Sequence, residues 1–362
     1  MPARTHQDDR LAIVVARTLT RAWRADPPTP SVTVEDLEPA VEQLVATGAA
    51  GLAWWAIRNE PELSGSAPGE SLQLAFRSQA LQAALHRRYL ESVLLAANRA
   101  GIEPLLLKGA AVSRDYPLPA LRPYGDIDLA VPRSQFARLS AALAEVPRPA
   151  FPVDIDLEHA FLSADGTPVE ELIERSVRLE IGSSSARIPC AGDSFRLLCI
   201  HFLRAAGRRA LSLADIALAL ERTSPSIDWT LALPQDDGRR RVLVAVTAGL
   251  AIDLLGADAA GTPLENAAAS VPPWVRAHVL QGFEARPHAF LPDARFGWTV
   301  NPTQLGRQIA DRWPPDPLSV VVHHRRPLRR RPSRHLQALD FGARILVTAL
   351  PASRALRLRV AS

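Results

Sequence analysis

The chain has 362 residues, of which 47% are hydrophobic and 22% are charged, as in ordinary soluble globular proteins. This length is sufficient for two or three substructures with hydrophobic cores of their own. The two cysteines, Cys190 and Cys199, exclude a disulfide framework and a cysteine-based metal site, which indicates a reducing compartment. The apolar runs at residues 11–16 and 242–255 are too short for a secretory signal and a membrane span. We therefore expect a cytoplasmic protein that does not enter a membrane.

The basic charge is concentrated in one segment near the end of the chain. Between His323 and His335 the sequence has no acidic residue and six arginines: Arg325, Arg326, Arg329, Arg330, Arg331 and Arg334. These six exceed the formal net charge of +4 for the whole chain. The segment could bind a phosphate backbone or an acidic partner, or it could be a solvated linker interrupted by prolines, the interpretation that we favour.

Lysine is almost absent from the sequence. Lys108 is the only lysine, so the other basic residues among the 42 are all arginines. The abundance of arginine, alanine and proline indicates a mutational bias against lysine codons. A lysine retained directly before Gly109 is expected to do what arginine cannot, such as placing a compact ammonium beside phosphates. Survival by chance is the alternative.

The first hundred residues predict helices and no chemistry of their own. Residues 11–24 have an amphipathic pattern, and Thr33 is suited to cap a helix that extends to residue 46. Residues 62–69 predict a loop. Residues 71–100 predict a long helix that ends at Gly101.

Residues 104–131 predict a strand, a turn and a second strand. A buried strand at residues 104–107 precedes Lys108 and Gly109, and after a short helix and a proline-rich turn the second strand carries Asp126 and Asp128. Residues two apart on a strand point to the same face, so the two carboxylates project together. Such carboxylates repel each other unless a cation lies between them. A divalent metal completed by phosphate oxygens is the usual solution.

A further acidic strand is predicted at residues 153–159, after a helix at residues 133–145. Its acids, Asp154, Asp156 and Glu158, alternate with apolar residues and therefore share one face. This face could be solvated, or it could supply a third carboxylate to Asp126 and Asp128.

The rest of the chain predicts a hairpin at residues 177–188, helices at 194–204, 211–221 and 239–256, and an amphipathic helix at 336–350, with less regular structure beyond Val271. We predict an α/β (α+β) fold in four regions. These are an N-terminal helical region (1–100), a core with the sheet (101–190), a C-terminal helical region (191–315), and an arginine-rich tail with a terminal helix (316–362).

The motif around the first acidic strand resembles the uncharacterised bacterial nucleotidyltransferase family of the DNA polymerase β-like superfamily. The residues that carry the resemblance are Leu107, Lys108, Gly109, Tyr116, Pro117, Leu121, Arg122, Pro123, Asp126, Ile127, Asp128, Leu129 and Val131. It extends over roughly residues 35–255. The pair Gly109-Ala110 departs from the Gly-Gly or Gly-Ser usual in the superfamily, so a hydroxyl contact to phosphate is missing there.

The resemblance implies a small mixed sheet whose strand acids hold two Mg²⁺ ions. By this comparison Asp126 and Asp128 would hold the metal, together with a third acid that we place at Asp156, with Asp154 as its rival. Lys108, Gly109 and Arg122 would bind the triphosphate.

The implied function is magnesium-dependent transfer of a nucleoside monophosphate, or a phosphoryl group, from an NTP to an acceptor hydroxyl. We expect ATP as the donor and a small molecule or peptide of a biosynthetic pathway as the acceptor. Nucleic acid is not the expected acceptor, because the core lacks a basic surface with interspersed aromatic residues. Two rivals remain: a catalytically silent protein that binds NTP, and a nucleic-acid or acidic-partner binder that uses residues 325–334.

Overall fold

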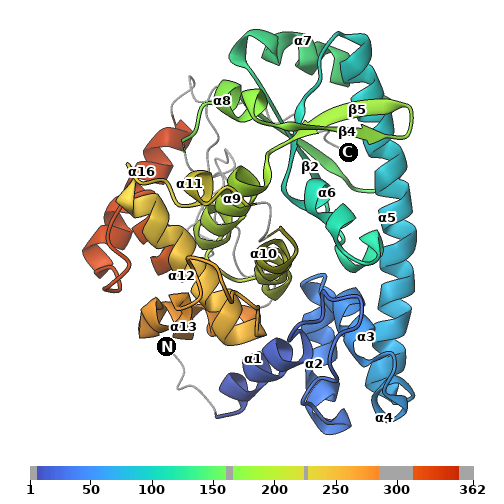
Figure 1. The fold of residues 1–362 in the computed structure, drawn as a ribbon, viewed down its shortest axis with the longest axis vertical. Coiled ribbons are helices and arrows are strands. Elements are labelled where there is room, and N and C mark those ends of the chain that lie inside the picture. The colour runs from blue at the N-terminus through green and yellow to red at the C-terminus, as the bar shows by residue number, and fades with distance from the viewer. Residues whose placement is uncertain (1–5, 160–165, 224–226, 285–312, 350–362) are drawn as a thin grey trace.

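The structure, a computed structural model of the chain, describes residues 6–159, 166–223, 227–284 and 313–349. A five-stranded mixed sheet lies at one end of the molecule, and the N-terminal and C-terminal helices pack against each other beside it (Figure 1). This arrangement confirms the predicted α/β (α+β) class.

The N-terminal helices are α1 (His6–Thr18), α2 (Val34–Ala46), α3 (Ala50–Ile57), α4 (Pro61–Ser64) and α5 (Ala67–Arg99). The predicted cap of α2 is confirmed, because the Asp36 backbone N–H donates to Thr33 Oγ1 at 3.2 Å and the Thr33 N–H donates to the Asp36 carboxylate. The prediction of a loop at residues 62–69 was wrong. The short helix α4 lies there, and α5 already begins at Ala67, where the Ser66 hydroxyl accepts from the Gly69 N–H.

Helix α5 connects the N-terminal helices to the sheet (Figure 1). Its 33 residues give it a length of about 50 Å. It contacts α2 and α3, and it also contacts β5 and α7 (Arg133–Ala144). The side chains of Leu90, Val93 and Leu94 on its later turns are buried in the core beneath the sheet.

The strands are β1 (Leu105–Leu107), β2 (Asp126–Val131), β3 (Asp154–His159), β4 (Val177–Ile181) and β5 (Ser184–Ile188), in the spatial order β3-β2-β1-β5-β4. β1 pairs antiparallel with β2 and parallel with β5, while β2 pairs parallel with β3. β4 and β5 form the predicted hairpin, which turns at Gly182 with a φ of +59°.

The two faces of the sheet differ in chemistry. One face is apolar: Ile127 and Leu129 of β2 pack with the side chains of α5 and α7. On the other face, Leu107 and Ala130 pack with α8 (Val169–Glu174) and with Leu197 of α9 (Ala191–Arg204). Because side chains alternate along a strand, the acids of β2 and β3 lie on this second face.

The later helices are α9, α10 (Ala210–Thr223), α11 (Trp229–Ala232), α12 (Gly238–Leu255), α13 (Pro273–Glu284), α15 (Pro317–His323) and α16 (Arg334–Ala349). α13 is a regular helix in a stretch predicted to be less regular, whereas residues 285–312 lie outside the described residues. The N-terminal and C-terminal helices share one hydrophobic core, in which Leu19, Leu44, Phe202 and Leu250 are all buried. The predicted four-region division stays a prediction. No helix in the described part of the chain is both long and apolar enough to cross a membrane.

Candidate active site

Strands β2 and β3 bring the predicted acids together. In their parallel register, Asp126 lies beside Asp154 and Asp128 beside Asp156. Neighbouring strands are about 4.8 Å apart, so side chains at paired positions project from the same face side by side. The sequence predicted both acidic strands, and the structure adds their register.

Three of these carboxylates converge. One oxygen from each of Asp126, Asp128 and Asp156 can be chosen so that all three lie within 4.8 Å of one another. Asp128 is only 2% exposed, Asp156 is half-buried, and Asp126 is exposed at the start of β2. Asp154 lies at the exposed start of β3 and is not part of this group.

Lys108 faces the carboxylates from the neighbouring strand end. Leu107 pairs with Asp128 across β1 and β2, so the next residue of the chain reaches the same place. The Lys108 Nζ lies 2.6 Å from Asp128 Oδ1 and 3.7 Å from Glu158 Oε1. Burial opposes the charge of Lys108, but Asp128, Glu158 and Asp126 raise its pKa above the ordinary lysine value. The sequence predicted a role for this lysine but not its contact with Asp128.

A single ammonium does not balance this group of carboxylates. Burial is the main cause that raises the pKa of Asp128 to about 6, Lys108 acts in the opposite direction, and Asp126 and Asp156 add to the rise. A divalent cation would relieve this repulsion, and carboxylate oxygens are the ligands that Mg²⁺ prefers. The residues present therefore fit the metal that the sequence motif predicts.

Gly109 lies where the chain turns from β1 into the short helix α6 (Lys108–Val112). A Cβ atom added to Gly109 would stand 2.8 Å from the Tyr124 Cβ and 3.2 Å from the Arg122 Nη1. Glycine is therefore required by packing at this position, in addition to the approach to phosphate that we predicted.

Arg122 has a partner that the sequence analysis did not identify. Its Nε and Nη2 donate to the carboxylate of Asp215 on α10, with Nη2 2.7 Å from Oδ2, and its Nη1 donates to the carbonyl oxygen of Pro123 at 2.8 Å. The Tyr116 hydroxyl also donates to Asp215, at 2.8 Å. A signal was present, because a lone aspartate within the apolar run of α10 requires a partner when it is buried.

An open pocket of about 770 Å³ lies beside the carboxylates. Its lining combines Asp126, Asp128 and Lys108 with residues from the end of α9 and its connection to α10. Among these are His201, Arg208 and Arg209. Arg208 is paired with Asp316 at 3.1 Å. Arg209 is exposed, its Nη2 donates to the Thr47 carbonyl oxygen at 3.4 Å, and it forms no ion pair within the described ranges.

A second pocket, of about 410 Å³, adjoins the first at Lys108 and His201, which line both. The rest of its lining is mostly apolar, with Leu107, Leu197 and Leu198 beside the carboxylate of Glu158. Burial, and then Lys108 and nearby arginines, lower the pKa of His201 to about 3. The imidazole between the two pockets is therefore neutral at physiological pH.

A family model described as an uncharacterised nucleotidyltransferase matches residues 34–237, more than half of the chain. The chain belongs to this nucleotidyltransferase family. The match confirms the resemblance drawn from the Lys108–Asp128 motif, and it includes the sheet, the carboxylate group and both pockets. Comparison with curated proteins and with solved structures gave no match.

The arginine-rich segment lies outside the family match and extends from the end of α15 to Arg334, the first residue of α16. All six of its arginines are exposed, and none pairs with an acid of the described residues. The segment is nevertheless anchored in its middle, because Leu328 is 2% exposed and its carbonyl oxygen accepts from the Trp274 indole N–H at 2.7 Å.

Proposed function

We propose that this protein transfers a nucleoside monophosphate from an NTP, with ATP as the expected donor, to a hydroxyl group of a small molecule or peptide. The observation that carries the proposal is the convergence of Asp126, Asp128 and Asp156 beside a pocket with cationic residues. Membership of a nucleotidyltransferase family supports the reaction class.

In this proposal the three carboxylates hold Mg²⁺, and Asp156 is preferred to Asp154 as the third ligand. The chemistry that two magnesium ions supply when bound is charge stabilisation of the leaving pyrophosphate and of the attacking oxygen. The register of β2 and β3 supports this assignment, because it sets Asp156 directly beside the buried Asp128.

The triphosphate would lie in the 770 Å³ pocket. Lys108 and the exposed Arg209 face this pocket with positive charge, and the Gly109 backbone lines it. Arg122 also lines it, but three of its nitrogens already donate to Asp215 and Pro123. We therefore assign Arg122 to positioning the turn before β2 and assign phosphate contact to Arg209.

The acceptor would enter from the smaller, more apolar pocket, which meets the larger one at Lys108 and His201. Its hydroxyl oxygen forms a bond to the α-phosphorus while the bond from that phosphorus to the bridging oxygen breaks, so that pyrophosphate leaves. Asp156 accepts the hydroxyl proton.

Mass spectrometry of candidate acceptors incubated with each of the four NTPs and Mg²⁺ tests the proposal. The wild type should add the mass of a nucleoside monophosphate, and the Asp126→Ala/Asp128→Ala variant should not. If both proteins give the same low level of product and the wild type still binds NTP, the protein is a nucleotide-binding protein without transferase activity. A gain of one phosphate would instead show phosphoryl transfer.

A further inference from the structure

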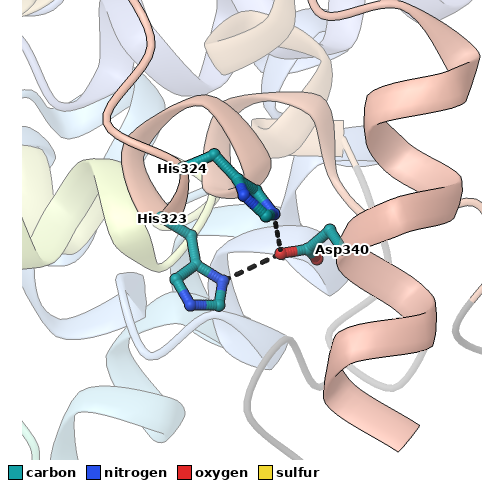
Figure 2. Close-up of side chains that lie close together, drawn as sticks. All are labelled: His323, His324 and Asp340. Atoms are coloured by element: carbon teal, nitrogen blue, oxygen red, sulfur yellow. Dashed lines mark hydrogen bonds and ion pairs between the residues drawn. The ribbon is translucent and has the colours of Figure 1, made fainter. Parts of the chain in front are cut away.

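A second group of metal-binding side chains lies far along the chain from the carboxylates. His323 and His324 stand at the end of α15, and Asp340 faces them from α16 (Figure 2). The His323 Nδ1 lies 2.8 Å and the His324 Nε2 lies 3.0 Å from one oxygen of Asp340, its Oδ1. Asp340 itself is fully buried.

Few of the described side chains of α16 are buried, so the contact of Asp340 with the two histidines matters for how this helix packs on the rest of the protein. Among the side chains of α16 at residues 334–343, only Gln337 and Asp340 are buried, and both are polar. Gln337 Nε2 donates to the Pro315 carbonyl oxygen at 2.7 Å. Over these residues the buried side chains of α16 make polar contacts, with Asp340 central to them, and the half-buried Phe341 adds an edge-to-face contact with Trp313.

We propose that His323, His324 and Asp340 bind a Zn²⁺ ion that fastens α16 to α15. Two imidazole nitrogens and one carboxylate oxygen form a donor set that suits zinc, with a fourth position left for water. The three ligand atoms already lie within 4.8 Å of one another. Ligands of tetrahedral zinc are about 3.3 Å apart, so small side-chain movements are sufficient to admit the ion.

The donor atoms favour zinc over a hard cation, because two of the three are imidazole nitrogens. Arg239 of α12 donates to the Val322 carbonyl oxygen, and the exposed Arg325 directly follows His324. The positive charge of these arginines opposes any divalent cation, so affinity for an ion at this site must come from the imidazole nitrogens. Zinc gains affinity from imidazole nitrogen and is less dependent on net negative charge.

This site is separate from the proposed reaction. None of its three residues lines either pocket described above, and all three lie outside residues 34–237. The zinc would thus stabilise the end of the described chain, and it does not depend on the function proposed for the carboxylates.

The test is calorimetric titration of ZnCl₂ into chelator-treated, full-length protein. The Asp126→Ala/Asp128→Ala variant is used as the background so that the strand carboxylates do not contribute. One zinc per chain is expected. His323→Gln should weaken the affinity for zinc by more than about 100-fold. Loss of a residue that only hydrogen-bonds to a metal ligand already lowers metal affinity by up to about 100-fold, and His323 is itself a ligand. His335→Gln, which changes an exposed histidine at the start of α16, should leave the affinity unchanged.

Two further measurements separate zinc binding from a folding effect. Zinc should raise the Tm of the background protein and of the His335→Gln control, but not that of His323→Gln. Co²⁺ in place of zinc should give the strong visible absorption of a tetrahedral site, and His324→Gln should remove it. Absence of zinc binding in the background protein, or equal binding in His323→Gln, would overturn the proposal and leave Asp340 held by hydrogen bonds alone.

Discussion

Arg122 and Asp215 form a buried ion pair across 93 residues of sequence, with Nη2 2.7 Å from Oδ2 and Nε 3.0 Å from both carboxylate oxygens. The side chain of Arg122 is 9% exposed and that of Asp215 is 1% exposed. The pair joins the turn before β2 to α10. It therefore connects the strand that bears the acids to the helix that forms the other wall of the pocket.

Arg122→Ala should destabilise the protein by about 3–5 kcal/mol, because it leaves the Asp215 carboxylate buried without its partner. Chemical denaturation measures this loss. Arg209→Ala is the matched control, since Arg209 lines the same pocket but is exposed. It should change stability by no more than about 1 kcal/mol, the usual net value of a hydrogen bond such as the one from Arg209 Nη2 to the Thr47 carbonyl oxygen, and still weaken NTP binding. Similar stability in both variants would contradict the structural role of Arg122.

The sequence predicted the elements whose signals are local. Alternation along residues 154–158 predicted an acidic strand, and the capping residue Thr33 predicted the start of α2, as found. The partners of Arg122 and Lys108 could not be predicted, because they depend on how distant segments pack. The contact of Asp340 with His323 could not be predicted for the same reason, because it depends on how α15 and α16 pack against each other.

The register of β2 and β3 yields a test of the third carboxylate. Asp156→Asn should lower the rate of nucleotidyl transfer by at least about 100-fold, because a carboxylate that holds metal and accepts a proton is lost. Asp154→Asn, two residues away on the same strand face, should reduce it by no more than about threefold. Initial rates of pyrophosphate release measure both. The reverse order would assign the role to Asp154.

The raised pKa of Asp128, about 6, predicts pH-dependent metal binding. Below pH 6 a proton competes with the metal for this carboxylate, so Mg²⁺ affinity should fall by about tenfold per pH unit. Titration of Mg²⁺ at pH 5, 6 and 7.5, followed by the shift in Tm, measures the effect. Asp128→Asn should weaken Mg²⁺ binding at all three pH values, and Asp154→Asn should keep both the binding and its pH dependence.

The same shift has a consequence for the metal-free protein. The folded-state pKa of Asp128 lies above its ordinary value of 3.8, so between about pH 4 and pH 6 the folded state binds a proton that the unfolded state releases. The contribution of this carboxyl group to the free energy of unfolding therefore falls as pH rises through that interval. Denaturation of wild type and Asp128→Asn across these pH values isolates this contribution: the stability of the wild type relative to the variant should fall as pH rises.

Lys108→Arg should lower the rate of transfer by about tenfold or more although the charge is kept. The ammonium lies 2.6 Å from Asp128 and 3.7 Å from Glu158, and a planar guanidinium is larger and donates in a different geometry. Steady-state kinetics measure the loss, and the Tm shows whether the variant folds. Unchanged kinetics would mean that the retained lysine is incidental.

Gly109 and Gly125 provide a matched pair for the packing of the first turn of α6. At Gly109 an added Cβ would stand 2.8 Å from the Tyr124 Cβ, whereas at Gly125 nothing lies within 4 Å. Gly109→Ala should therefore destabilise the protein by about 1–3 kcal/mol, the usual cost of overpacking, and displace Tyr124 at the pocket wall. Gly125→Ala, which also alters the pocket lining, should change stability by less than about 0.5 kcal/mol. Urea denaturation of both variants measures the difference. If the two variants are equally stable, the turn can move to accept a side chain at residue 109. The packing reason for Gly109 is then wrong, and only the close approach of its backbone to phosphate remains.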